Sequence, residues 1–438
     1  SGRIPLMVKN GYKGPVYTTG ATTELCGIML RDSAHIQEFE AEWRNRKAKR
    51  SGAEEYQPLY TMEDAEAALA LFHSVDYGET VQVGPNIRAR FTDVGHLLGS
   101  ASIELWVTEG TETRKIVFSG DIGNTHQPLL RDPQPIKEAD FVVMESTYGD
   151  RSHGPRPDYV PELAAVLQDT FDRGGNLVIP SFAVGRTQEM LYFLRQIKEQ
   201  NLVKGHDNFT VYVDSPMAVE ATQVFKSSWA ECYDEEARTL VMQGVNPINF
   251  RGLKLSLSSD DSKAINFDKE PKVILSASGM CEAGRIRHHL KHNLWRPEST
   301  VLFVGYQSAG TLGRALVEGA KEVKLFGETI EVRCKVLVLA GVSGHADNEG
   351  LLNWVKNFDP KPRTVFVTHG EDGVCDIFAN RLRSELGLAA VAPYNGAQYD
   401  LVTGSCLAVG NTRRIEKAEA GGKKRENPVF RRLLDAGN

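Results

Sequence analysis

Three residues that could bind a transition metal each follow a run of residues typical of a β-strand. His96 follows an alternating strand in FTDVGHLLGSAS, Asp121 follows IVFSG, and His369 follows TVFVT. Imidazole nitrogen and carboxylate oxygen bind zinc, and a hydrolytic zinc site keeps an open position for water. Taken singly, a core histidine explains His96 better, and a turn aspartate explains Asp121 better. Because the three residues span about 270 positions, a shared zinc site is a hypothesis.

A carboxylate and a further histidine could carry out acid–base chemistry. Glu145 ends the strand-like run FVVM and opens ESTYGDR, and His345 lies in AGVSGHADNEG between a strand-like and a helix-like segment. A helix cap or a buried polar role explains His345 about equally well. A carboxylate that holds an imidazole fixes its tautomer and raises its basicity. The pair could therefore supply a proton to a leaving group.

The elements that would position these residues alternate along the chain. Short apolar runs, each followed by small or polar residues, are typical of buried strands that end in functional loops. These runs occur at 116–121, 141–146, 177–182, 211–215, 273–278, 301–306, 336–341 and 364–370. Helix-like segments lie between them at 159–173, 187–199 and 348–357. This alternation predicts an α/β fold.

Length and composition limit the class of protein. A chain of 438 residues exceeds what one hydrophobic core usually covers, so two domains, or one inserted into another, are expected. An apolar fraction of 41%, without a run of about 18 apolar residues, argues against a membrane protein. Six scattered cysteines without a CxxC pair indicate reduced thiols and a cytoplasmic protein. The net charge of −6 argues against nonspecific coating of nucleic acid but permits a local basic groove.

Eight short motifs occur along the chain in the order GHLLGSA, FSGDIG, MESTYGDR, PSFAVGRTQE, SASGM, GYQSAGTLGR, SGHADN and THGE. This ordered set resembles the β-CASP ribonucleases, a branch of the metallo-β-lactamase superfamily that contains the RNase J enzymes and the cleavage and polyadenylation endonuclease. The resemblance runs from residue 1 to about residue 400. It implies a metallo-β-lactamase αββα sandwich with an inserted α/β β-CASP domain.

The resemblance also implies a role for each candidate residue. It makes His96 a zinc ligand, Asp121 the carboxylate that bridges two zinc ions, and His369 a ligand of the second zinc. It makes Glu145 the acidic motif residue and His345 its partner beside the leaving oxygen. The DNA-processing branch of the family tends to have an apolar residue where His369 stands. RNA is therefore the expected substrate.

The family's first metal motif, HxHxDH, is expected immediately ahead of Ser1 and does not occur in this sequence. The chain opens SGRIPLMVKNGY, with neither an initiating Met nor a signal-peptide profile, so we expect it to start within a longer protein. The lactamase-like half would then be N-terminally truncated. Because a catalytic zinc usually has three protein ligands, we expect the chain as given to bind zinc poorly and to cleave little or no RNA.

The resemblance predicts the domain limits and an RNA cleft between the domains. Residues 1–149 and 342–438 would form the metallo-β-lactamase domain, the latter with a basic C-terminal tail, and residues 150–341 the β-CASP domain. Several β-CASP residues at strand ends could hold phosphates, although a plain loop role explains most of them about equally well. Arg186, which opens a helix-like segment, is the strongest phosphate candidate. The full set is Ser181, Gly185, Arg186, Ser278, Gly279, Tyr306 and Arg314.

The segment RIRHHLKHN places His288 and His292 four residues apart on a helix, a spacing that could bind metal. Because basic residues surround both histidines, a solvated basic helix explains the segment better. The mixed charges at 37–56 and the basic stretch 413–432 are likewise typical of solvated faces.

Two other functions stay open. A small-molecule hydrolase of the same superfamily, such as a thioesterase or lactamase, would lack an insertion of about 190 residues of this kind. A noncatalytic RNA-binding scaffold would be expected to lose the five candidate residues, which are all present. The leading prediction is a zinc-dependent ribonuclease with two zinc ions and no membrane association. Internal cleavage, cleavage from the 5′ end and a homodimeric state are all compatible with the sequence.

Overall fold

The computed structural model describes residues 2–48, 55–154, 157–339 and 343–413. The chain divides into two compact units, Ser1–Val391 and Ala392–Asn438. In the second unit, β18 (Gln398–Tyr399) and β19 (Cys406–Ala408) form an antiparallel pair. Most of the basic stretch 413–432 lies outside the described residues. No helix in the described part of the chain is long and apolar enough to cross a membrane.

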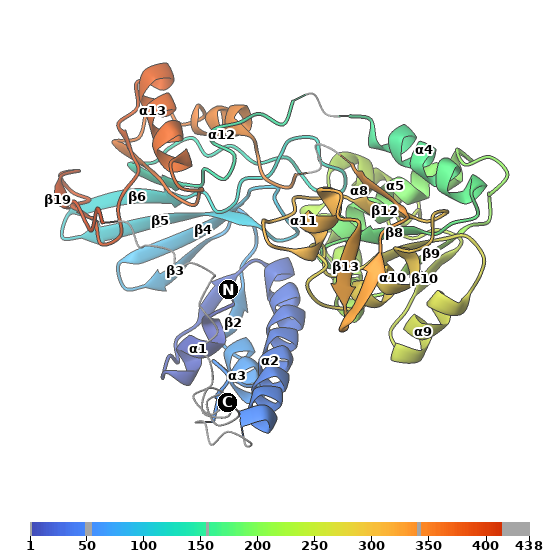
Figure 1. Cartoon of the computed structure of the whole chain (residues 1–438). Helices are drawn as coiled ribbons and strands as arrows, with labels where there is room; N and C mark the ends of the chain where they lie inside the picture. Colours follow the sequence, from blue (N-terminus) through green and yellow to red (C-terminus); the bar gives the residue numbers. More distant parts are fainter. Residues whose placement is uncertain (1, 49–54, 155–156, 340–342, 414–438) are drawn as a thin grey trace, which may run out of the picture. The chain divides into compact units, whose positions relative to one another are not determined.

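A seven-stranded sheet in the larger unit is drawn at the left of Figure 1, in the order β17-β16-β7-β6-β5-β4-β3. Strands β3 to β6 are antiparallel neighbours, whereas β6, β7, β16 and β17 are parallel neighbours. In β4 Ala89 and Phe91 are buried, as the alternating pattern predicts, whereas Ile87 at the start of the strand is exposed. The strands are β3 (Thr80–Gly84), β4 (Ile87–Asp93), β5 (Ala101–Glu109), β6 (Glu112–Phe118), β7 (Phe141–Met144), β16 (Thr364–Val367) and β17 (Ala390–Val391). Helices α12 (Asn348–Val355) and α13 (Val374–Leu386) lie along one face in Figure 1.

A six-stranded parallel sheet, at the right of Figure 1, has the order β10-β9-β11-β8-β12-β15. Successive residues of its central strands enter two different cores: Leu177 and Ile179 join one core and Val178 the other. Strands buried on both faces read as continuous apolar runs, which is the pattern seen in the sequence. The strands are β8 (Leu177–Pro180), β9 (Thr210–Val213), β10 (Leu253–Leu255), β11 (Lys272–Ser276), β12 (Thr300–Phe303) and β15 (Lys335–Val338).

One of these runs is wrongly predicted as a buried strand. In β15, Leu337 and Val338 are 36% and 52% exposed. These side chains are exposed because β15 is an edge strand, which pairs only with β12 among the described strands. The apolar run therefore marks the strand correctly but not its burial.

Helices cover both faces of the six-stranded sheet. Residues of α4 to α8 close the core that contains Leu177, and residues of α9, α10 and α11 close the core that contains Val178. These helices are α4 (Tyr159–Asp172), α5 (Arg186–Glu199), α6 (Pro216–Ser227), α7 (Trp229–Cys232), α8 (Glu235–Met242), α9 (Ser259–Phe267), α10 (Ile286–Asn293) and α11 (Leu312–Val317). A hairpin of β13 (Glu322–Leu325) and β14 (Glu328–Glu331) precedes β15.

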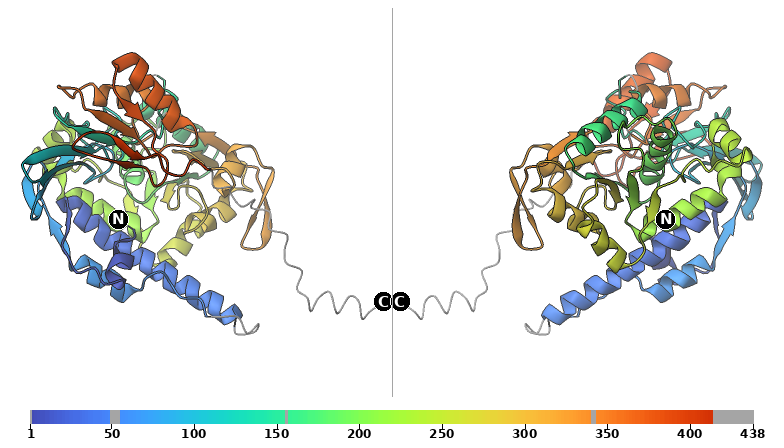
Figure 2. Two further views of the ribbon diagram at one scale, coloured as in Figure 1. Left: turned by 90° about the vertical axis from the view of Figure 1, so that its left-hand side faces the viewer. Right: turned by 90° about the vertical axis from the view of Figure 1, so that its right-hand side faces the viewer.

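The N-terminal segment packs against the core of the six-stranded sheet and contacts the loop after β4. It contains α1 (Ile4–Lys9), β1 (Val16–Thr18), α2 (Gly20–Ala48), α3 (Met62–Leu69) and β2 (Phe72–Ser74). Ala21 and Leu25, at the start of α2, join the core of the six-stranded sheet, whereas Leu30 and Ala34 pack near Tyr60. In both side views of Figure 2 the far end of α2, in blue, projects beyond the sheets.

The order of the strands along the chain is that of one domain inserted into another. Every strand of the six-stranded sheet falls between 150 and 341, and the chain then returns to the first sheet with β16 and β17. The predicted boundary at 341/342 lies outside the described residues. The proposed limits 1–149, 150–341 and 342–438 therefore stay a prediction.

Candidate metal and acid–base site

Four of the predicted residues follow strands that end at one edge of the seven-stranded sheet. Strands β6, β7 and β16 are parallel neighbours, and β4 runs in the same direction because two antiparallel pairings connect it to β6. His96, Asp121, Glu145 and His369 follow β4, β6, β7 and β16 respectively. The carboxyl ends of strands in an open α/β sheet are where ligands bind. The topology therefore brings together residues that the sequence left far apart.

The donor atoms of His96, Asp121 and His369 are spaced as zinc ligands could be. His369 Nε2 lies 3.4 Å from Asp121 Oδ1, and His96 Nε2 lies 3.9 Å from Asp121 Oδ2. Two ligands at ordinary zinc distances on a tetrahedral ion are about 3.4 Å apart. The two carboxylate oxygens thus face different imidazoles, as a carboxylate shared between two ions requires. These residues fit the predicted zinc chemistry.

The surroundings of His96 favour its neutral imidazole form. Burial, together with the nearby His345, lowers the pKa of His96, and the opposing effect of Asp121 is smaller. The rings of His96 and His345 lie 4.4 Å apart between centroids. Neutral imidazole is the form that binds a metal ion. The surroundings of His96 therefore favour a ligand role.

The loops that carry His96 and Asp121 are in backbone contact. A Cβ atom at Gly123 would lie 2.2 Å from the carbonyl carbon and oxygen of Gly95 and 2.7 Å from His96 N. The amide of Gly123 donates to Val94 O at 2.8 Å, so the contact is also a hydrogen bond. Only glycine fits at this approach. Gly123 therefore sets the separation of two candidate ligands.

Glu145 and His345 form the predicted pair. His345 Nδ1 lies 3.1 Å from both carboxylate oxygens of Glu145, which is buried. The backbone amides of Ile122 and Thr147 also donate to Glu145. Burial would raise the pKa of Glu145, but these hydrogen bonds and the charge of His345 outweigh it and lower that pKa. Glu145 is therefore an ionised carboxylate that orients the imidazole.

The same pairing favours a protonated His345. Burial would lower the pKa of His345, but the hydrogen bond and charge of Glu145, with a smaller effect of Asp121, raise it above its ordinary value. The backbone is fixed as well, because Ala346 N donates to Ile122 O at 2.8 Å and Asn124 N donates to Gly344 O at 3.1 Å. The segment that follows Asp121 thus pairs with the segment that carries His345.

His345 also satisfies the distance criterion for a metal ligand. One donor atom each from His96, Asp121 and His345 lies within 4.8 Å of the other two. The Glu145 contact occupies Nδ1, so Nε2 is the ring nitrogen of His345 that remains for a metal ion or a leaving oxygen. Geometry alone is thus compatible with both a proton donor and a ligand at this position.

Three predicted phosphate-binding residues line a cavity next to this site. Gly185, Arg186 and Tyr306 share a cavity of about 410 Å³ with His96 and His345. The Arg186 guanidinium is largely buried and pairs with Glu189. A phosphate contact by Arg186 would therefore compete with an internal carboxylate.

The other predicted phosphate-binding residues contact neighbouring protein groups. Ser181 Oγ is 2.8 Å from Thr187 Oγ, Ser278 Oγ donates to Ala283 O at 3.3 Å, and Arg314 Nε donates to Glu318 at 2.7 Å. The carbonyl of Gly279 accepts from Gln307 Nε2 at 3.0 Å. Their assignment to phosphate binding stays a prediction.

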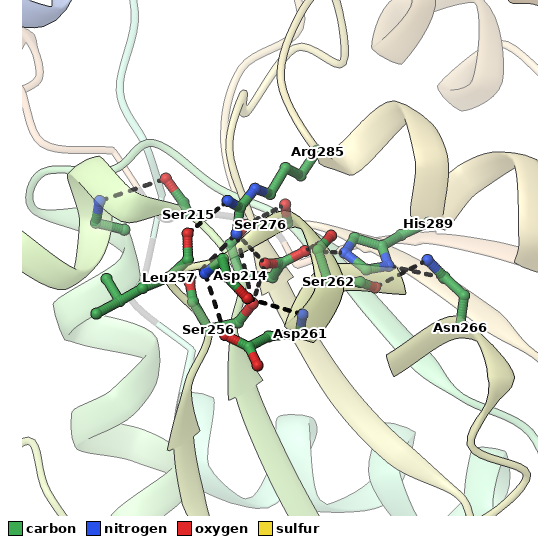
Figure 3. A network of polar contacts seen from close by, with 12 residues as sticks. Asp214, Ser215, Ser256, Leu257, Asp261, Ser262, Asn266, Ser276, Arg285 and His289 are labelled. Carbon is green, nitrogen blue, oxygen red and sulfur yellow. Dashed lines mark hydrogen bonds and ion pairs between the residues drawn. The ribbon is translucent and has the colours of Figure 1, made fainter. Parts of the chain in front are cut away.

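A buried polar network at the carboxyl ends of β9 and β11, drawn in Figure 3, was not predicted from the sequence. Asp214 accepts from Ser256 Oγ at 2.6 Å, Ser262 Oγ at 2.5 Å, Arg285 Nη1 at 2.7 Å and His289 Nε2 at 2.6 Å. Burial would raise the pKa of Asp214, but these donors hold that pKa well below its usual range. A fully buried carboxylate is thus paired on both oxygens.

The network anchors the loop after β11, which contains Ser278 and Gly279. Arg285 closes this loop and also donates from Nη2 to Leu257 O at 2.7 Å. In contrast, His288 stacks on Phe326 with ring centroids 4.4 Å apart, and His292 lies edge-on to Phe267. The histidine of α10 that belongs to a charged cluster is therefore His289. The sequence had singled out His288 and His292, which lie on either side of it.

Comparison with known proteins gives the family. The Beta-Casp domain matches residues 187–316, and the Zn-dependent metallo-hydrolase RNA specificity domain matches residues 329–393. Ribonuclease TTHA0252 of Thermus thermophilus is 37% identical over 373 residues, covering 85% of this chain and 78% of that protein. Transcription termination factor FttA is 32% identical over 403 residues in Methanocaldococcus jannaschii and over 406 residues in Methanosarcina mazei. These matches cover 90% of this chain but 60% of each FttA protein.

The chain therefore belongs to the β-CASP ribonuclease family of the metallo-β-lactamase superfamily. The predicted α/β fold with an inserted β-CASP domain and the predicted class of metal-dependent hydrolase are confirmed. Among solved structures, a protein of unknown function from Enterococcus faecalis V583 aligns with 86% of this chain and 74% of that chain, at a TM-score of 0.46 and 15% identity. That likeness is too weak to add to the assignment.

Proposed function

We propose that this protein hydrolyses phosphodiester bonds of RNA with two zinc ions at the edge of the seven-stranded sheet. The observation that carries the proposal is the Glu145–His345 pair next to His96 and Asp121. An acid–base pair beside a shared carboxylate suits a two-metal hydrolase in which a charged oxygen leaves. The names of the relatives, a ribonuclease and a transcription termination factor, support RNA as the substrate.

His96 and Asp121 would hold one zinc ion, and Asp121 and His369 the other. Bound zinc supplies an activated water molecule and stabilises the charge on the transferring phosphoryl group. Each ion would have two ligands among these residues, whereas a catalytic zinc usually has three. The remaining ligands would come from the family's HxHxDH motif.

His345 would give its proton to the leaving oxygen. Glu145 holds the imidazole through Nδ1, so Nε2–H is the ring donor that remains for the leaving oxygen. The raised pKa of His345 keeps that proton in place at neutral pH more often than an ordinary histidine would. The lowered pKa of Glu145 keeps this carboxylate ionised at neutral pH. Proton supply and metal binding are thus assigned to different residues.

The experiment is digestion of end-labelled single-stranded RNA, with zinc, by the chain joined to an N-terminal segment that carries HxHxDH. We expect cleavage that is abolished by Asp121→Ala and retained in Asp132→Ala, a matched aspartate of the same loop outside the site. The label also distinguishes internal fragments from mononucleotides. Turnover of a chromogenic ester without RNA cleavage would instead support a small-molecule hydrolase, and RNA binding without any cleavage would support a scaffold.

A further inference from the structure

Two cavities border the candidate site, and two tyrosines line both. The cavity of about 410 Å³ contains His96 and His345, and a second cavity of about 330 Å³ contains His369. Tyr148 and Tyr306 belong to the lining of each cavity. A strand of RNA that crosses the site from one cavity to the other would therefore pass over aromatic side chains.

The larger cavity lies at the carboxyl ends of β8 and β12, where the strand order of the six-stranded sheet reverses. Strands β8 and β12 are parallel neighbours, but the chain leaves β8 toward β9 on one side and leaves β12 toward β15 on the other. Loops that depart in opposite directions open a crevice at the carboxyl ends of such strands, where ligands bind. Phe182 follows β8 and Tyr306 follows β12, and both line this cavity.

Both rings are exposed to solvent, and hydrogen bonds hold the backbone of Phe182. Phe182 is 46% and Tyr306 is 56% exposed, and among the described residues neither ring has an aromatic partner. The carbonyl of Phe182 accepts from Thr187 Oγ at 2.7 Å. The Phe182 ring covers Gly279, where an added Cβ would lie 3.2 Å from two ring carbons. An aromatic side chain has only two rotatable bonds, so an exposed ring loses little entropy when a flat partner stacks on it.

We propose that Phe182 and Tyr306 stack the bases of nucleotides next to the scissile phosphate. The occupant is single-stranded RNA, because the same cavity contains two candidate site histidines and the buried Arg186–Glu189 pair. Stacking on aromatic rings is the usual sequence-tolerant way to hold a single strand. The inference rests on the proposed function and adds the part of the substrate that these rings recognise.

The subsite requires that the effect of each ring depends on the base. Removing one stacked ring typically weakens binding by roughly 10-fold. An RNA with abasic sites at the stacked positions should bind weakly to the unchanged chain and lose nothing further in Phe182→Ala or Tyr306→Ala. Tyr306→Phe should retain the base-dependent loss on abasic RNA that Tyr306→Ala abolishes, because stacking needs the ring and not the hydroxyl.

The experiment is equilibrium binding of a single-stranded RNA labelled with 2-aminopurine to the 438-residue chain in EDTA, where metal-dependent cleavage does not interfere. We expect quenching of the label at the stacked positions, and loss of both quenching and affinity in Phe182→Ala and in Tyr306→Ala. Phe267→Ala is the matched control, because Phe267 is 76% exposed on α9 and lies outside both cavities. Thermal unfolding confirms that each variant is folded.

Two results overturn the subsite and are distinguishable from failure of the proposed function. Equal losses on intact and abasic RNA, or unchanged affinity in both alanine variants, would show that the rings do not stack bases. In either case the unchanged chain still binds RNA, and the proposed ribonuclease activity stands. If the unchanged chain binds no RNA, the subsite is wrong, and the cleavage assay with HxHxDH and zinc still decides the proposed function.

Discussion

Replacing His345 by alanine tests the division of labour between proton supply and metal binding. The change removes the imidazole whose Nδ1 lies 3.1 Å from both Glu145 oxygens. A positioned acid–base group typically contributes 10²–10⁴-fold to the rate. In a chain supplied with HxHxDH we therefore expect RNA cleavage to slow by roughly 100-fold or more, which corresponds to about 2.7 kcal/mol or more of activation free energy.

The structure indicates that this loss is catalytic and not a failure to fold. Without His345, the buried Glu145 keeps two backbone donors, the amides of Ile122 and Thr147. The loop pairing through Ala346 N and Ile122 O uses backbone atoms only and is untouched by the substitution. We therefore expect the unfolding temperature to fall modestly while the rate falls strongly. Glu145→Gln should slow cleavage as well, and the double variant should be little slower than His345→Ala, because the two residues act as one unit.

The assay is single-turnover cleavage of labelled RNA together with zinc analysis of the same samples. His126→Ala is the control, since His126 lies in the loop after Asp121 and its side chain is 85% exposed. We expect unchanged zinc content in both variants and an unchanged rate in the control. Loss of one zinc from His345→Ala would refute the reasoning and make His345 a ligand, which its position within 4.8 Å of the His96 and Asp121 donors permits.

Three further outcomes follow from particular contacts. Gly123→Ala should lower both stability and zinc affinity, measured by unfolding and zinc titration, because its Cβ would lie 2.2 Å from the Gly95 carbonyl. Asp214→Asn should lower the free energy of unfolding at pH 7. Because the pKa of Asp214 is depressed in the folded state, the extra stability of the unchanged chain is complete above the ordinary pKa of about 3.9 and shrinks as the pH falls below it. Urea unfolding of both chains from pH 7 to pH 3 measures this difference. Arg186→Ala should weaken RNA binding and lower its salt dependence by about one counterion, whereas Glu189→Gln, which removes a negative charge paired with Arg186, should tighten binding; unchanged affinities across a salt titration would make Arg186 structural.

The sequence predicted the strand ends well because buried parallel strands leave a simple pattern. The apolar runs that precede Asp121, Glu145 and His369 correspond to β6, β7 and β16, and their polar residues follow the strands as expected. Their convergence was not readable, because it depends on the order in which the strands pair. Strands β7 and β16 pair although their residues are more than 220 positions apart in the sequence. The hydrogen bond from Ser146 Oγ to Thr368 O, just beyond these strands, spans a similar separation.

The sequence missed what depends on contacts between loops. Gly123 has an ordinary place in FSGDIGN, and only the approach of the Gly95 carbonyl explains it. Asp214 ends the strand-like run VYVDS and offered the same signal as Asp121, a carboxylate at a strand end. Its partner His289 lies between His288 and His292, where the spacing drew attention to the wrong pair. A carboxylate after a buried strand therefore marks a polar site without specifying catalysis or packing.

Zinc content is the most direct test of the central claim, that His96, Asp121 and His369 form part of a two-zinc site that HxHxDH completes. The measurement is elemental analysis after dialysis against trace zinc, made on the 438-residue chain and on the same chain with an HxHxDH segment ahead of it. We expect less than one zinc in the first, two in the second with RNA cleavage, and loss of both in Asp121→Ala. Two tightly held zinc ions in the 438-residue chain, retained in Asp121→Ala, would contradict the account.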